Sequence, residues 1–302
     1  MDLRAYILQF DCLASTEIRL PPFKGSAIRG AFFSALRGDF CLDRRVPGCS
    51  SCQVRQSCPV SALLATVDES SVRGIEVARP CTIEPPLETQ TLYRPGDPLS
   101  FGVTLFGNAW ELLAYVVLGV RRMGEIGLGN RPLAPGRFSI QQIKAIDPIS
   151  GRSQHVYSCD ENLVRCPDVP VVHSTILSAC ESLAGQTSVT LELLTPMRLI
   201  ADGVLVKAIS FPVLARRILR RLTDLTRSAC GSHPDFDHEQ LLIQAETVET
   251  AEDRTHWVDV SSFSSRQGRS TPIGGLMGQI TFEGDLKPFA PWLLWGTITH
   301  VG

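Results

Sequence analysis

The chain has 302 residues, of which 44% are hydrophobic and 20% are charged, a balance that lets two domains of about 150 residues each bury a core. The formal net charge of −2 excludes a protein that coats nucleic acid through an overall positive charge, so any RNA contact has to use local basic patches. No apolar stretch approaches the roughly 18 residues of a membrane helix, and the N-terminus lacks a signal-peptide pattern. We therefore expect a cytoplasmic protein without membrane contact.

The first half predicts one α+β unit in the order β-α-β-β-α-β. Its first helix has apolar residues at spacings of three to four, and Ser26 can cap it. The predicted elements span residues 3–12, 27–37, 76–84, 98–106, 109–123 and 138–146. This order is typical of a ferredoxin-like (RRM-like) fold. We assign it to a domain over residues 1–150 with a cysteine-rich insertion at 39–59.

The second half predicts the same order without its last strand. The elements, β-α-β-β-α, span residues 189–194, 212–228, 241–249, 273–282 and 288–298. The polar stretch 151–186 is expected to connect two tandem ferredoxin-like domains, the second over 187–302. A sheet without its last strand exposes an unpaired edge, which favours a truncated chain over a different closure of the fold.

Ten cysteines in a chain without a signal peptide are expected to be thiols or metal ligands rather than disulfides. Four of them are close in sequence: Cys41, Cys49, Cys52 and Cys58. The Cys49-x-x-Cys52 spacing is typical of a metal knuckle, and a structural zinc ion would order a loop with few apolar residues. An iron–sulfur cluster takes the same four thiolates. A set of reduced thiols without metal is the remaining alternative.

Three groups of residues are candidates for RNA binding. Arg217, Arg220 and Arg221 share one face of the predicted helix over 212–228, a face that is either solvated or seats an RNA stem. Gly127 and Gly129 either let the backbone approach a phosphate or form a plain turn. The third group is a polar loop that is either solvated or binds phosphates and base edges through its side chains: Ser264, Ser265, Arg266, Gln267 and Arg269.

Several motifs occur in a fixed order along the chain. They include Phe23-Lys24-Gly25-Ser26-Ala27-Ile28-Arg29-Gly30, Met123-Gly124-x-x-Gly127-Leu128-Gly129, Thr195-Pro196-Met197-Arg198-Leu199, Phe263-Ser264-Ser265-Arg266-Gln267 and Ile273-Gly274-Gly275-Leu276-Met277-Gly278. Together they resemble the CRISPR-associated endoribonucleases that process precursor crRNA, members of the repeat-associated mysterious protein superfamily. The resemblance implies an RNA-binding endoribonuclease that cleaves CRISPR repeat RNA to generate crRNA.

The resemblance also implies a metal-independent reaction, in which a 2′-hydroxyl attacks the adjacent phosphate. Such a reaction needs a base, an acid and cations around the phosphate. Lys24 and Arg29, at the start of the first helix, are candidates for the cations. The family usually has a catalytic histidine near this helix, but residues 1–154 contain none. His256 is therefore the candidate for proton transfer, followed by His300.

Two other functions are compatible with the same residues. The missing N-terminal histidine favours a non-catalytic crRNA-binding subunit of a CRISPR effector complex. A metal-binding scaffold built on the cysteine loop is the third hypothesis. Under the first two hypotheses the partners are CRISPR repeat RNA or crRNA and other effector subunits, without direct binding to DNA.

Overall fold

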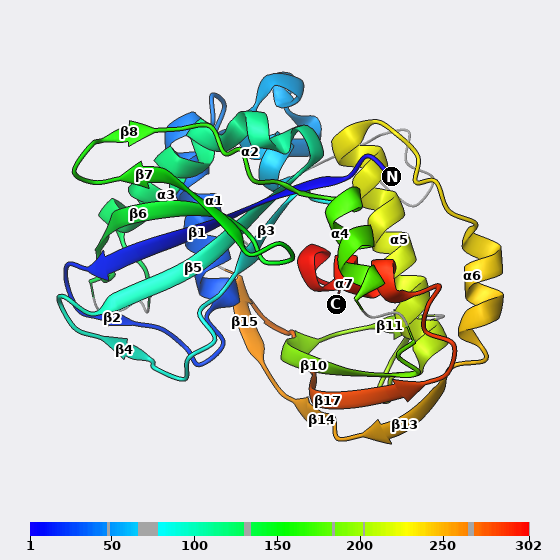
Figure 1. The fold of residues 1–302 in the computed structure, drawn as a ribbon. Coiled ribbons are helices and arrows are strands. Elements are labelled where there is room, and N and C mark those ends of the chain that lie inside the picture. The colour runs from blue at the N-terminus through cyan, green and yellow to red at the C-terminus, as the bar shows by residue number, and fades with distance from the viewer. Residues whose placement is uncertain are drawn as a thin grey trace. The chain divides into compact units, whose positions relative to one another are not determined.

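The computed structural model describes residues 1–46, 49–65, 78–129, 134–182, 185–201, 203–264 and 269–301. The chain divides into two compact units (Figure 1). We call Asp2–Val172 with Asp224–Ser232 the N-terminal unit, and Met1 with His173–Thr223 and His233–Gly302 the C-terminal unit. Within the described ranges, no helix is both long and apolar enough to cross a membrane.

The N-terminal unit contains a ferredoxin-like sheet. Its main elements in chain order are β1 (Arg4–Ala14), α1 (Gly25–Phe40), β3 (Cys81–Glu84), β5 (Pro98–Phe106), α3 (Leu113–Ile126) and β6 (Phe138–Asp147). The strands pair antiparallel in the order β3-β5-β1-β6. This is the β-α-β-β-α-β arrangement expected from the sequence, so the predicted fold of the first half is confirmed.

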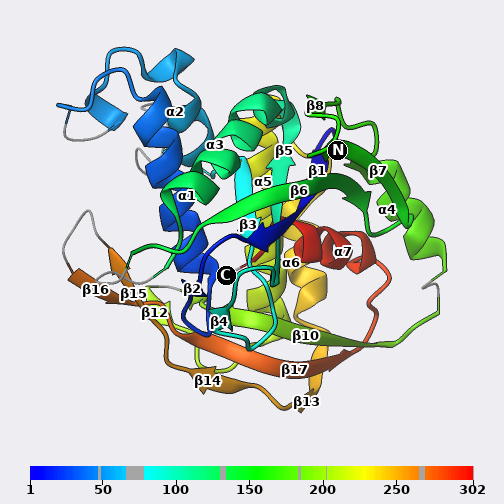
Figure 2. The same cartoon turned by 90° about the vertical axis from the view of Figure 1, so that its left-hand side faces the viewer.

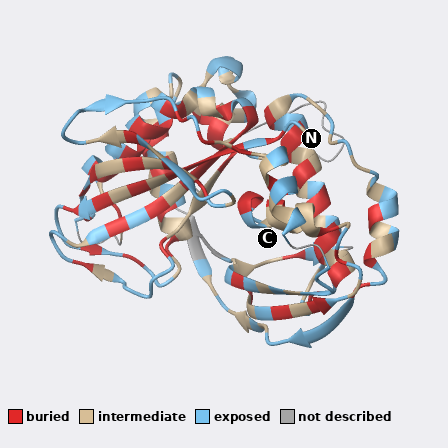
Figure 3. Ribbon diagram, in the orientation of Figure 1, coloured by how far each residue is buried: buried red, intermediate tan, exposed pale blue. Residues whose placement is uncertain are grey.

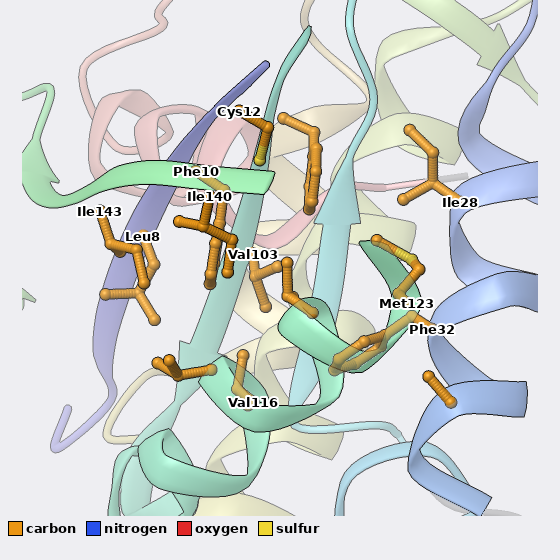
Figure 4. Close-up of a cluster of buried hydrophobic side chains, with 14 of the residues drawn as sticks. Leu8, Phe10, Cys12, Ile28, Phe32, Val103, Val116, Met123, Ile140 and Ile143 are labelled. Atoms are coloured by element: carbon orange, nitrogen blue, oxygen red, sulfur yellow. The ribbon is translucent and has the colours of Figure 1, made fainter. Parts of the chain in front are cut away.

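The core of this unit lies between the sheet and the pair of helices α1 and α3, which lie side by side (Figures 2 and 4). The rings of Phe10 and Phe101 stack with centroids 5.5 Å apart. A Cβ atom on Gly119 of α3 would lie 2.6 Å from a methyl group of Leu36 of α1. The two helices can therefore approach this closely only because residue 119 has no side chain.

Shorter elements complete the N-terminal unit. They are β2 (Ile18–Arg19), η1 (Cys49–Ser51), η2 (Arg55–Ser57), α2 (Pro59–Leu64), β4 (Leu92–Tyr93), η3 (Gly107–Leu112), β7 (Arg152–Ser158), β8 (Leu163–Val164) and β9 (Val171–Val172). The segment 151–186 is expected from the sequence to be a loop-like connection, but part of it extends the sheet. Strand β7 pairs with β6, and β8 pairs with β7. These strands are largely exposed (Figure 3). One face of an antiparallel sheet can be exposed to solvent and can therefore carry polar residues. For this reason the polar sequence of this segment predicts a loop rather than strands.

The C-terminal unit contains a smaller antiparallel sheet. The elements from residue 173 on are α4 (His173–Glu181), β10 (Ser188–Met197), β11 (Ile200–Ala201), β12 (Val204–Leu205), α5 (Phe211–Cys230), α6 (His238–Ala245), β13 (Glu249–Asp253), β14 (His256–Val258), β15 (Ser261–Ser264), β16 (Arg269–Pro272), β17 (Gly275–Glu283) and α7 (Ala290–Thr299). The last part of α5, from Asp224 on, belongs to the N-terminal unit. Strand β17 pairs with β10 on one side and with β13 and β14 on the other. In the described part of the chain β10 has no partner on its outer side. This is the edge at which the last strand of a ferredoxin-like unit pairs. The sequence predicts a second unit without that strand.

Aromatic residues hold this second unit together. Phe211 of α5 makes edge contacts with Phe282 and Phe289, at centroid distances of 5.2 and 4.9 Å. The Trp295 indole N–H of α7 donates to His173 Nδ1 of α4 at 3.1 Å. Burial lowers the pKa of His173, so this histidine is a neutral acceptor within the helix pair.

One predicted strand is wrong, because residues 238–245 form the helix α6 instead. The Asp237 carboxylate accepts the Gln240 amide at 2.9 Å and caps the helix. Leu241 and Ala245, four residues apart, are its buried positions. A short apolar run fits a strand or a helix equally well by its periodicity, and the cap at Asp237 was the signal that distinguishes them.

Candidate RNA interface

Basic side chains of the C-terminal unit surround the small hairpin formed by β11 and β12. Arg198 precedes the hairpin, and its Nη1 donates to the carbonyl of Gly274 at 3.1 Å. Lys207 follows the hairpin, and its Nζ lies 3.2 Å from the centre of the Trp257 ring. On α5, Arg217 donates to the carbonyl of Ile200 in β11. We call Arg198, Lys207, Arg217 and Arg220 the basic cluster.

The cluster has an excess of positive charge. In the part of the chain that the structure describes, Arg198, Lys207 and Arg217 form no salt bridge. Burial, and then the nearby charge of Arg220, lower the pKa of Arg217. A guanidinium carries five N–H donors, so an arginine that already holds one carbonyl keeps donors for a phosphate. An anion bound here would relieve the repulsion between the two guanidinium groups.

Trp257 adds an aromatic surface to the cluster. Its indole N–H donates to Asp259 Oδ1 at 2.8 Å, and β14 holds it opposite Leu276 of β17. A Cβ atom on Gly274 would lie 2.6 Å from the Val258 carbonyl oxygen, so the glycine permits a close approach beside the tryptophan. A cation against an indole ring is favourable, and aromatic rings among cations are typical of sites for single-stranded RNA.

The predicted arginine face of α5 has two different parts. Arg217 and Arg221 are half-buried and tie α5 to neighbouring backbone, Arg217 through Ile200 and Arg221 through the Thr299 carbonyl at 3.2 Å. Arg220 is exposed. The periodicity therefore placed the three residues on one side of the helix, but packing gives Arg220 the solvent-facing position.

The predicted polar loop lies at the β15–β16 hairpin. Ser264 pairs with Arg269 in the backbone register, whereas Ser265, Arg266 and Gln267 lie outside the described residues. His256, the candidate for proton transfer, is exposed on β14. Because successive side chains of a strand point to opposite faces, His256 faces away from the side on which Trp257 meets Lys207.

In the N-terminal unit the two candidate cations differ in exposure. Lys24 is fully buried and its ammonium donates to the carbonyl of Glu88. Burial lowers the pKa of Lys24, while the charge of Glu88 opposes that shift. The Tyr93 hydroxyl in turn donates to Glu88 Oε1 at 2.6 Å. Lys24 therefore joins the start of α1 to the segment before β4.

Arg29 lies on the outside of α1 and is exposed. Desolvation by the surrounding protein, and then the nearby positive charge of Arg79, lower its pKa. Neither arginine forms a salt bridge within the described ranges. Arg79 carries no signal of its own in the sequence, since it is a single arginine within the predicted strand over residues 76–84.

Gly127 and Gly129 follow α3 with φ angles of +92° and +101°. A Cβ atom on Gly129 would lie 2.4 Å from the carbonyl oxygen of Arg19 in β2. Both glycines thus allow the loop to pack against neighbouring backbone. Their direct contact with RNA stays a prediction.

The four cysteines of the loop between α1 and α2 are all half-buried. Within the described residues, no three potential ligands stand close enough together to hold a metal ion in their present positions. Of the other six cysteines, Cys12 and Cys81 are buried, and Cys159 and Cys166 are exposed. Burial raises the pKa of Cys81 to about 12, so it is an inert apolar filler.

Two family models match the two halves of the chain. The model AF_1859_N, described as an N-terminal domain, matches residues 3–169. The model of the CRISPR-associated endoribonuclease Cas6 matches residues 191–302. An uncharacterized protein of Archaeoglobus fulgidus is 26% identical over 259 residues, which are 85% of this chain and 79% of the relative.

Solved structures share the fold. A partial Cas6-RT-Cas1–Cas2 complex contains a chain with a TM-score of 0.60 and 13% identity, matched over 100% of this chain and 44% of that one. Thermus thermophilus Cas6 has a TM-score of 0.51 and 12% identity, over 100% and 94% of the two chains. A Cas6 product complex has a TM-score of 0.51 and 14% identity, over 99% and 94%. The AF_1859_N model covers more than half of the chain, so the chain belongs to the family that this N-terminal domain defines, and its residues 191–302 match the model of the CRISPR-associated endoribonuclease Cas6.

Proposed function

We propose that this protein binds the repeat sequence of precursor CRISPR RNA and cleaves it to release crRNA. The observation that carries the proposal is the basic cluster around β11 and β12 beside Trp257, within the half that matches the Cas6 family. Its cations suit RNA phosphates, and its aromatic ring suits an unpaired base. Because the net charge is −2, affinity has to come from this local patch rather than from the whole surface.

The proposed reaction uses a nucleophile that belongs to the RNA. The 2′-oxygen forms a bond to the adjacent phosphorus, and the bond from that phosphorus to the 5′-oxygen of the next nucleotide breaks. The products are a 2′,3′-cyclic phosphate and a 5′-hydroxyl, so no metal-bound water is required. A base accepts the 2′-hydroxyl proton, an acid donates to the leaving oxygen, and arginines stabilise the charge on the phosphate.

Three residues are proposed for this chemistry on different grounds. Arg29 is exposed and can reach a phosphate, and His256 is exposed and carries an imidazole, a group that can serve as a general acid or base. Lys24 is buried and bonded to Glu88. We therefore propose that Lys24 acts by positioning the start of α1, the helix that carries Arg29, rather than by touching RNA.

A second candidate function is a crRNA-binding subunit that assembles with other CRISPR effector proteins and does not cut. Two observations favour it: residues 1–154 contain no histidine, and His256 faces away from the Lys207 side of β14. Under this function the basic cluster retains its role, and only the cleavage step is absent.

One experiment separates the two functions. A labelled repeat RNA from the source genome is incubated with the protein in the presence of a chelator, and binding and cleavage are measured in the same samples. A single cut that leaves a cyclic phosphate supports the endoribonuclease. Tight binding without a cut supports the crRNA-binding subunit, and absence of specific binding contradicts both proposed functions.

Single variants then assign the roles. Arg29→Ala and His256→Ala are expected to slow the cut by at least about 100-fold, the usual contribution of acid–base or charge stabilisation, with little change in the Kd for RNA. Lys287→Ala removes an exposed cation outside the cluster and serves as the control. An unchanged rate in His256→Ala would remove this histidine from the mechanism.

A further inference from the structure

Trp257 carries a cation on one face of its ring. The Lys207 Nζ lies 3.2 Å from the centre of the ring, well within the range of a cation–π contact. A planar base stacked on the same face would lie about 3.5 Å above the ring, the contact distance between carbon atoms. The ammonium and a base would therefore occupy the same space, so only one of them can cover this face at a time.

The indole ring itself is held in place. Its N–H donates to Asp259 Oδ1 at 2.8 Å, and Trp257 pairs with Leu276 in the register of β14 and β17. At the edge of the ring, a Cβ atom on Gly274 would lie 3.3 Å from Trp257 Nε1. Arg198 Nη1 donates to the carbonyl of this glycine at 3.1 Å, which places a second cation beside the segment that borders the ring. The indole thus presents a fixed, flat surface that needs no rearrangement to receive a ligand.

The Lys207 side chain, in contrast, is free to move. Lys207 is exposed, and among the described residues its ammonium makes no hydrogen bond and no salt bridge. The backbone on both sides is held, because the Val206 amide donates to the carbonyl of Leu199 at 2.9 Å and Ile209 is buried. A lysine has a flexible four-carbon stem, so the ammonium can leave the ring without any change in the fold.

The strengths of the two contacts decide which occupant prevails. An exposed cation–π contact favours an association by about two- to fivefold. Stacking of one base on an aromatic side chain favours binding by about 5- to 150-fold. A base therefore displaces the ammonium, and the displacement cancels only a small part of the gain. The stacked nucleotide also brings its own phosphate to the rim of the ring, where the released ammonium gains a charged hydrogen-bond partner.

We propose that the face of Trp257 under Lys207 seats one unpaired base of the RNA, and that Lys207 then leaves the ring and pairs with the phosphate of that nucleotide. This inference rests on the proposed function, because the ligand is part of the bound repeat RNA. Inside a duplex both faces of a base are covered by its neighbours, so such a base has no face for the indole. The site therefore selects a single-stranded nucleotide, and in the RNA-free protein the ammonium covers the ring.

Nuclear magnetic resonance of the lysine side chains follows this exchange in the full chain. The chain has four lysines, so a carbon label at the ε position of lysine gives a small set of signals. The ring current of an indole shifts protons above its face upfield. The Lys207 signal, identified by its loss in Lys207→Arg, is therefore expected upfield in the RNA-free protein, and saturation with repeat RNA should return it to the position of an ordinary exposed lysine. Lys287, an exposed lysine of the same unit, is the internal control and should not shift.

The same repeat RNA annealed to its complement separates stacking from charge. The duplex presents phosphates but no free base, so it should leave the Lys207 signal upfield. A duplex that also shifts this signal would show that phosphates alone remove the ammonium, and would overturn the base seat. A signal that is not upfield in the RNA-free protein, or that stays upfield when anisotropy of the same sample shows full binding of the repeat RNA, overturns this inference alone. Absence of specific RNA binding overturns the proposed function together with it.

Discussion

Removal of two exposed cations from the basic cluster tests whether RNA binds there. Lys207→Ala with Arg220→Ala removes one charge from the end of the β11–β12 hairpin and one from α5. Each cation that neutralises a phosphate of single-stranded RNA contributes about 0.7 to the slope of log K against log salt concentration. If both contact phosphates, the slope decreases by about 1.4.

The same slope sets the loss of affinity. Relative to 1 M salt, two contacts contribute about 1.4 log units at 0.1 M, so the variant should bind about 25-fold more weakly, a loss of about 2 kcal/mol. At 0.3 M the loss should shrink to about fivefold. Both side chains are exposed, and we therefore expect the thermal stability of the variant to change little.

The assay is a titration of labelled repeat RNA at several salt concentrations, with fluorescence anisotropy as the readout. Lys287→Ala with Arg254→Ala is the matched control, because it removes a lysine and an arginine of the same unit, and Arg254 is already paired with Glu252 at 2.7 Å. If the control loses as much affinity as the cluster variant, or if the loss does not depend on salt, RNA does not bind at the basic cluster.

Three further predictions address the tryptophan, the glycine loop and the buried lysine. Trp257→Ala should weaken RNA binding by about 1–3 kcal/mol through lost stacking, whereas Trp257→Phe should retain most of the affinity; equal losses in both would exclude stacking. Gly129→Ala should lower the free energy of unfolding by about 3 kcal/mol or more, because residue 129 has a φ of +101° and the new Cβ atom would clash with the Arg19 carbonyl. Gly151→Ala is the control: residue 151 has a φ of +72° with open space around it, so the substitution should cost only about 1 kcal/mol. The pKa of Lys24 is lower in the folded state than in the unfolded state, so on raising the pH the folded state releases the Lys24 proton first. The free energy of unfolding of the unmodified protein, relative to that of Lys24→Met, should therefore rise with pH between the two pKa values. Denaturant titrations of both proteins at several alkaline pH values measure this difference, and a difference that falls as the pH rises would contradict the prediction.

The main elements of the fold were predictable because their patterns are strong. β5 alternates buried and exposed residues along part of its length, and α1 buries Ile28, Phe32, Ala35 and Leu36 at helical spacing. Strands β7 and β8 have no strong signal in the sequence, because β7 is largely polar and β8, the edge strand, is short and exposed. The short apolar run in α6 predicts a strand, and only the cap at Asp237 indicates the helix that the structure has there.

The candidate site was less predictable, because residue type does not reveal burial or proximity. Lys24 and Arg29 belong to the same motif, yet one is enclosed and bonded to Glu88 while the other is exposed. Lys207 has no local sequence signal at all, and it joins the cluster only because β14 brings Trp257 to it. These relations depend on pairing between strands that are far apart in the sequence.

If the proposed function holds, binding and cleavage are separable, because the tryptophan proposed for binding and the histidine proposed for proton transfer occupy different faces of β14. Trp257 and Lys207 meet on one side of β14, and His256 points to the other. If the basic cluster only positions RNA, it stabilises the substrate and the transition state equally. The Lys207 and Arg220 double variant should then raise the RNA concentration needed for half-maximal cleavage, while the single-turnover rate at saturating RNA stays unchanged. A lower saturating rate would instead show that the cluster stabilises the charge that develops on the phosphate, and would place it in direct contact with the reacting group.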